Sequence, residues 1–175
     1  MNYEKTIFIV ILTGIVLIGN GILAARNWPY WFPPRQDLNL IFKYGVGAKN
    51  ELNTFKNTYT KDMVVDLPIT INLTLSDQEI ETIYTKMKAV NFFNFPQELP
   101  TPRDPNALIT IVTPCDDFYL KVISDSGNKE YFWDNCGEKL YQNFSELDEL
   151  SNLIQDIIQS RTEFQELPEP RGGYT

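Results

Sequence analysis

The segment that most constrains the fold is CDDFYLKVISDSGNKEYFWDNC, residues 115–136, which has one of the chain's two cysteines at each end. Apolar and polar residues alternate on either side of the turn-forming cluster at 124–128, which predicts a β-hairpin. A turn centred near residue 126 sets Cys115 opposite Cys136. Facing residues of antiparallel strands have Cα atoms about 4.5–5.5 Å apart, within the range of about 4.4–6.8 Å that a disulfide requires. We therefore expect a disulfide that closes the hairpin.

The cysteines have three competing interpretations. Two thiolates are half of a structural zinc site, and the chain has no histidine to complete it. Oxygen ligands from Asp116, Asp117 or Asp134 would complete such a site poorly, because thiolates and carboxylates suit different metals. A redox pair is typical of a CxxC motif at a helix N-terminus, and neither is present here. Unpaired buried thiols are the alternative to the disulfide.

Aromatic residues occur on both faces of the predicted hairpin. One face must belong to the core. The other then exposes aromatic side chains beside charged ones, which is typical of a docking surface or of a second covered face. The candidate residues of a surface for a protein or a small ligand are Tyr119, Lys121, Tyr131 and Trp133.

The absence of histidine excludes several kinds of catalytic site. Ser–His–Asp and Cys–His nucleophilic sites, His-ligated zinc and a haem histidine ligand all need that residue. Asp116, Asp117, Asp134 and Glu138 supply carboxylates, but no sequence feature specifies the cleft that a glycosidase builds around a carboxylate pair. We predict no catalytic residue, no metal and no cofactor.

The charge of the chain excludes a further class of partner. The sequence has 15 Lys and Arg against 23 Asp and Glu, a net charge of −8. Affinity for nucleic acid comes largely from Lys and Arg side chains that displace counterions, and the sequence has no basic stripe. Nucleic acid is therefore not an expected partner.

Residues 7–25, IFIVILTGIVLIGNGILAA, form a long apolar run. As a helix with a rise of about 1.5 Å per residue, the run reaches roughly 28 Å, close to the ~30 Å hydrocarbon core of a lipid bilayer. A cleaved signal peptide has a shorter apolar stretch and a small-x-small site, whereas the bulky Leu23 precedes Ala24 and Ala25. We expect residues 1–25 to be an uncleaved transmembrane signal anchor, with secretion after cleavage near Ala25 as the alternative.

An aromatic and proline-rich segment, residues 26–37, follows the apolar run. Its prolines predict a stiff spacer. Its aromatic side chains are typical of a membrane–water interface, with the domain core as their alternative place: Trp28, Tyr30, Trp31 and Phe32. The charges flanking the apolar run are nearly balanced, so the cysteine pair and the signal-like position of the run decide the orientation. We expect a single-pass membrane protein whose C-terminal domain lies outside the cytoplasm.

The rest of the chain is predicted to form one domain, residues 38–165, and an irregular tail, residues 166–175. GVGAKN at 45–50 lacks the GxxxxGK[ST] spacing of a phosphate-binding loop, so it is predicted to be a turn between strands. Outside the hairpin, strands are expected within residues 38–44, 53–59, 61–75 and 108–113.

Two helices are also predicted. Ser76 and Glu79 form a capping box, and apolar residues follow at helical spacing. A second apolar stripe runs from about Glu146 to Arg161 behind Ser145. Two helices, each with a single apolar face, and five to six strands predict a two-layer α+β fold. In this fold an antiparallel sheet is covered on one face by the two helices, and one transmembrane helix precedes it.

Three segments of the chain carry a resemblance: FKYGVGAKNELNTFKNTYTKDMV (42–64), the capped helix with FFNFP (92–96), and LPEPRGGYT (167–175). Through them, the chain resembles an uncharacterised group of small prokaryotic domains that are exported or membrane-tethered. The resemblance covers most of residues 38–175 and implies an α+β domain with no known activity. The element order is also similar in shape to small secreted protease-inhibitor domains, although a fold does not confer a function.

These features favour a membrane-anchored extracytoplasmic binding module without catalytic activity. One alternative is a protease inhibitor that uses the loop 96–106, whose prolines would pre-organise it. A more remote alternative is a thiol oxidoreductase that works through Cys115 and Cys136.

Overall fold

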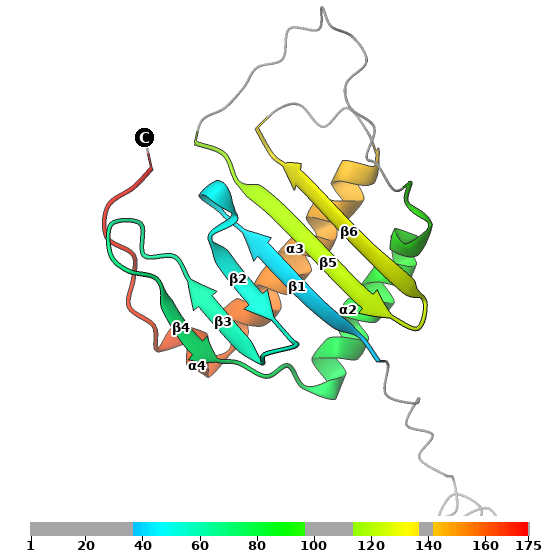
Figure 1. Cartoon of the computed structure of the whole chain (residues 1–175), viewed down its shortest axis with the longest axis horizontal. Coiled ribbons are helices and arrows are strands. Elements are labelled where there is room, and N and C mark those ends of the chain that lie inside the picture. Colours follow the sequence, from blue (N-terminus) through cyan, green and yellow to red (C-terminus); the bar gives the residue numbers. More distant parts are fainter. Residues whose placement is uncertain (1–36, 97–113, 137–141, 175) are drawn as a thin grey trace, which may run out of the picture. The chain divides into compact units, whose positions relative to one another are not determined.

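The computed structural model describes residues 37–96, 114–136 and 142–174. In this part of the chain, an antiparallel sheet of six strands has the order β4-β3-β2-β1-β5-β6 (Figure 1). The strands are β1 (Asn39–Tyr44), β2 (Asn50–Asn53), β3 (Thr58–Lys61), β4 (Ile69–Asn72), β5 (Asp117–Ser124) and β6 (Gly127–Asp134). The helices are α2 (Asp77–Ala89), α3 (Gln142–Ser160) and α4 (Thr162–Gln165), with short 3-10 turns η1 (Val46–Ala48) and η2 (Phe92–Asn94).

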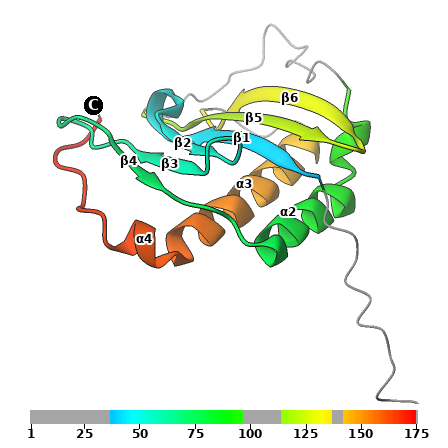
Figure 2. The same ribbon diagram turned by 60° about the horizontal axis from the view of Figure 1, so that its bottom comes forward.

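The two long helices, α2 and α3, lie on the same face of the sheet, which confirms the α+β prediction (Figure 2). Strand β1 shows why the sheet has one covered face: Leu40 and Phe42 are fully buried, while Ile41 and Lys43 between them point to the other face. The helices complete the core with one apolar stripe each. The fully buried residues of these two stripes are Ile83 and Met87 from α2, and Leu147, Leu150, Ile154 and Ile158 from α3.

The start of α2 agrees with the predicted capping box. The Ser76 hydroxyl accepts a hydrogen bond from the Glu79 amide at 3.3 Å, and the Ser76 amide donates to Glu79 Oε2 at 2.6 Å. The same carboxylate forms an ion pair with Arg161 at the end of α3, with Nη1 and Oε2 3.1 Å apart. One side chain therefore both caps α2 and joins it to α3.

Two predicted strands are corrected by the structure. Residues 53–59 are mostly the turn between β2 and β3, because Asn57 takes a left-handed conformation (φ +53°) that reverses the chain. Of residues 61–75, only Lys61 and the four residues of β4 are in strands. A positive φ at Val64 and the ring of Pro68 interrupt the rest.

The second helix begins earlier than predicted. It starts at Gln142, so Ser145 lies within α3 and is not its cap. No glycine or proline between these residues stops a helical turn from forming before Ser145. The predicted strand at 108–113 and the predicted anchor at 1–25 lie outside the described residues, and so does the predicted spacer at 26–37 except for Asp37. Among the residues that are described, no helix is long and apolar enough to cross a membrane.

Candidate functional site

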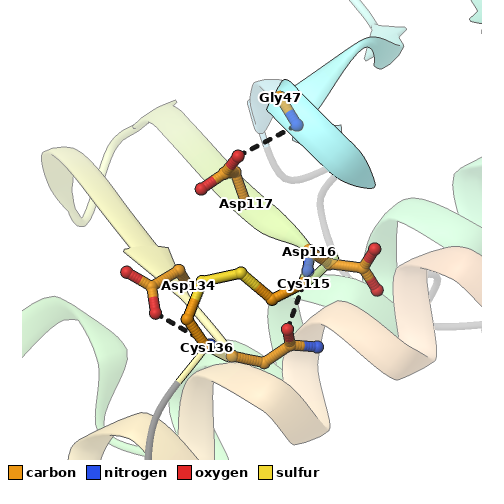
Figure 3. Close-up of a disulfide and its surroundings, with 7 residues drawn as sticks. Gly47, Cys115, Asp116, Asp117, Asp134 and Cys136 are labelled. Carbon is orange, nitrogen blue, oxygen red and sulfur yellow. Dashed lines mark hydrogen bonds between the residues drawn. A yellow bond between two sulfur atoms is a disulfide. The ribbon is translucent and has the colours of Figure 1, made fainter. Parts of the chain in front are cut away.

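Cys115 and Cys136 form a disulfide, as predicted (Figure 3). Their Cα atoms are 5.0 Å apart. The bond continues the register of the hairpin, because the amide of Asn135 donates to the carbonyl of Asp116 at 3.0 Å and the amide of Asp116 donates to Asn135 Oδ1 at 2.7 Å. The disulfide therefore closes the open end of β5–β6.

Two of the three aspartates around the disulfide, Asp117 and Asp134, bind backbone amides through their carboxylates (Figure 3). Asp117 Oδ2 accepts a hydrogen bond from the Gly47 amide at 2.9 Å, and Asp134 Oδ1 accepts one from the Cys136 amide at 2.9 Å. The glycine turn η1 thus binds a carboxylate of its own chain, in agreement with the prediction of a connecting turn. No group of three or more potential metal ligands occurs among the described residues, and Glu138 lies outside them.

The four candidate surface residues do not share a face. The register pairs Leu120 with Tyr131 and Phe118 with Trp133, so Tyr131 and Trp133 point into the core and are each only 3% exposed. The Trp133 ring stacks on Phe118 with centroids 5.2 Å apart, and the Tyr131 hydroxyl donates to the Phe95 carbonyl at 3.2 Å. The assignment of Tyr131 and Trp133 to a binding surface is therefore wrong.

Tyr119 and Lys121 lie on the opposite face of the hairpin, which the described helices leave uncovered. Their neighbours there are Ile123, Glu130 and Phe132, and these five residues are called the outer face below. Phe132 pairs with Tyr119 across the strands, and its side chain is 62% exposed. Phe132 is not among the candidate surface residues predicted from the sequence. It is the middle residue of the three consecutive aromatic residues in β6, and successive side chains of a strand point to opposite faces. Its side chain therefore lies on the face opposite to that of its two neighbours.

The charges on the outer face compensate one another. The Tyr119 hydroxyl donates to Glu130 Oε1 at 2.9 Å, and Lys121 Nζ lies 3.4 Å from Glu130 Oε2. Desolvation and the bond to Glu130 raise the pKa of Tyr119 to about 12, so its hydroxyl stays a donor at neutral pH. The hydrogen bond from Tyr119 and the ion pair with Lys121 lower the pKa of Glu130. The exposed Phe132 ring is therefore set among polar groups that already have partners.

A second exposed apolar region lies in the loop between β3 and β4. Val65 and Leu67 are 68% and 86% exposed, and Val64 has φ +62°, a conformation that β-branched residues rarely adopt. The amide of Val64 donates to Asp62 Oδ1 at 3.2 Å, which helps to fix this turn.

The C-terminal tail holds this loop in place. Lys61 Nζ donates to the Pro168 carbonyl at 3.0 Å, and Arg171 Nε donates to Asp66 Oδ2 at 2.7 Å. The Tyr174 hydroxyl bonds Asp62 and accepts from Lys49 Nζ. These contacts are called the C-terminal clamp below. Residues 166–174 of the tail form no helix and no strand, and they are packed against the domain.

Comparison with protein-family models finds no match, and neither does comparison with curated proteins. The resemblance to exported prokaryotic domains stays a prediction, and the functional assignment rests on the residues of this chain.

Proposed function

We propose that the chain is a membrane-anchored extracytoplasmic binding module whose contact site is the outer face of the β5–β6 hairpin. The observation that carries the proposal is Phe132, a large aromatic side chain that is 62% exposed in the middle of an ordered strand. Fully burying a phenylalanine side chain is worth about 1.5–3 kcal/mol, so a partner that covers this ring gains a substantial part of that free energy.

The surroundings of Phe132 suit binding more than catalysis. Glu130 and Lys121 are paired with each other, and Tyr119 donates to Glu130. Such a network orients a partner and selects against wrong ones, while the apolar ring supplies the burial. An aromatic anchor with a polar rim is the usual composition of a protein-binding surface.

The disulfide supports the extracytoplasmic placement. Disulfides persist in oxidising compartments and are rare in the cytosol, and the predicted anchor at residues 7–25 would hold the domain at a membrane. The bond between Cys115 and Cys136 lies just beyond the facing ends of β5 and β6, and the side chains labelled around it in Figure 3 include Asp116, Asp117 and Asp134. A reactive pair needs positive surroundings that stabilise a thiolate, so we assign this bond a structural role.

The proposal is tested by recovering partners from native membranes with a matched pair of variants. Tagged full-length chain, Phe132→Asp and Leu67→Asp are purified after gentle solubilisation, and the co-purifying proteins are quantified by mass spectrometry. Leu67 is the control because it is also an exposed apolar residue, at the other end of the sheet. We expect a stoichiometric partner with the wild type and with Leu67→Asp that is lost with Phe132→Asp. Equal recovery with both variants, or no stoichiometric partner, would contradict the proposal.

A further inference from the structure

We propose that the outer edge of β6 binds an extended peptide segment as an additional antiparallel strand, and that this segment carries a basic, an apolar and a basic side chain at alternate positions. This inference rests on the proposed function, because it names the class of partner for the same hairpin.

Along its outer edge, β6 has backbone groups that form no ladder with another described strand. Among the described residues, β6 has β5 on one side and no strand on the other. The Asn135 amide donates to the Asp116 carbonyl, so the backbone groups of Asn135 point towards the strand that precedes it in the hairpin. Because this direction alternates along an antiparallel strand, the backbone groups of Tyr131 and Trp133 also point to β5. Glu130 and Phe132 therefore direct theirs outward. A second chain can bind to such a row by strand addition.

The two edges of the sheet differ in how well they are protected against strand addition. Edge strand β4 has four residues and follows Pro68, which has no amide hydrogen to donate. Edge strand β6 has eight residues, and no proline interrupts it. The longer edge is thus the one that a partner strand can use.

The side chains along this edge define the chemistry of the partner. Glu130, Phe132 and Asp134 alternate on the outer face side of β6, and Asp116 and Asp117 lie beside the end that holds Asp134 (Figure 3). Residues that face each other across antiparallel strands interact directly, so basic residues opposite Glu130 and Asp134 and an apolar residue opposite Phe132 fit best. The net charge of −8 attracts a basic segment in the same sense.

A second copy of the chain fits the edge less well. Pairing two β6 strands so that the Phe132 rings face each other places Glu130 of one copy opposite Asp134 of the other. Like charges in facing positions are destabilising. A basic segment from a different protein avoids this repulsion.

The test measures amide hydrogen exchange at single-residue resolution in the full-length chain reconstituted in nanodiscs. The probe is the acetylated and amidated peptide TKTVTKT, and its charge-reversed control is TETVTET. We expect TKTVTKT to slow exchange at the amides of Glu130 and Phe132 at least tenfold and to leave those of Tyr131 and Trp133 unchanged. TETVTET should bind at least tenfold more weakly.

Two charge-changing variants sharpen this test. Glu130→Lys should weaken TKTVTKT at least tenfold, whereas Asn72→Lys, which adds a positive charge on the opposite edge strand, should leave its affinity unchanged. Equal binding of both peptides, or protection outside β6, would overturn the inference. It is also overturned when the amides of Glu130 and Phe132 exchange slowly without peptide, because the edge is then already occupied. If TKTVTKT gives no protection while partner recovery still depends on Phe132, this inference fails and the proposed function stands.

Discussion

The two ends of the sheet are held by different kinds of contact. At the β5–β6 end, a covalent bond joins Cys115 and Cys136, which are 21 residues apart in sequence. At the β3–β4 end, the C-terminal clamp is non-covalent, and its bonds from Lys61 to Pro168 and from Arg171 to Asp66 span 107 and 105 residues. Each end presents an exposed apolar side chain, Phe132 or Leu67. A covalent bond between residues close in sequence and non-covalent contacts between distant residues therefore both fix an end of the sheet, although their contributions to stability differ.

The largest effect is expected for the covalent end. Replacing both Cys115 and Cys136 by Ser should lower the free energy of unfolding by about 3 kcal/mol, because the unfolded chain regains the entropy of a loop of this size. Urea unfolding of the double variant, beside the wild type with and without reductant, measures the loss. If the wild type has the same free energy of unfolding with and without reductant, the disulfide does not stabilise the domain.

A smaller effect is expected for the clamp. Gly172 has φ +82°, and a Cβ added there would lie 3.1 Å from Val65 Cγ1, so Gly172→Ala should cost about 1–2 kcal/mol of stability. Gly173→Ala is the matched control, because a Cβ there meets nothing within 4 Å. Thermal unfolding of both variants makes the comparison. Equal midpoints would mean that the tail is not held against the loop.

Glu79 combines a local and a long-range contact in one side chain. Glu79→Ala removes the cap and the ion pair with Arg161 and should cost about 1 kcal/mol. Glu79→Gln keeps an N3 residue that can close the capping box and should lose less. Burial opposes the charge, but the Ser76 amide and hydroxyl and the Arg161 guanidinium outweigh it and lower the pKa of Glu79.

This lowered pKa fixes the pH dependence of the Glu79 contribution. The stability that the charged form supplies is fully present above the ordinary glutamate pKa of 4.5 and is lost as the pH falls through the lower folded value. Urea unfolding of the wild type and of Glu79→Gln should therefore differ at pH 7 and converge in acid. A difference that does not change with pH would show that the ion pair with Arg161 contributes nothing.

The smallest effects are expected for the exposed apolar side chains. Leu67→Ser and Phe132→Ser should each change the free energy of unfolding by no more than about 0.5 kcal/mol, because neither side chain is buried in the domain. Urea unfolding checks both variants. A loss above 1.5 kcal/mol for Phe132→Ser would mean that the ring is covered within the chain and is not a free contact site.

Local contacts were predictable from the sequence, and long-range contacts were not. The capping box at Ser76 and the disulfide between Cys115 and Cys136 depend on spacing within one element or one hairpin, and both are confirmed. The four candidate surface residues were grouped across both faces of the hairpin, although alternation separates Tyr131 and Trp133 from Tyr119 and Lys121. Alternation alone also does not say which of the two faces is covered. That depends on η2 and the helices, which pack beneath the sheet from distant parts of the sequence.

The clamp left no local signal of this kind. Its contacts join residues more than a hundred positions apart, so no periodicity or motif marks them. The left-handed conformation of Val64 was equally unpredictable, because a valine in a β-rich stretch indicates a strand. The tail supplies a bridge between Val64 and Arg171, and Gly172 leaves room for Val65.

The central claim is that the outer face of the disulfide-closed hairpin is the contact site. A photo-crosslinking scan along β6 tests this claim most directly. A photoreactive residue is placed in turn at positions 130, 131, 132 and 133 of the full-length chain in native membranes. The account predicts partner adducts at 130 and 132 and none at 131 and 133, because only the first two side chains lie on the outer face. Adducts without this alternation, or none at position 132, would contradict the account.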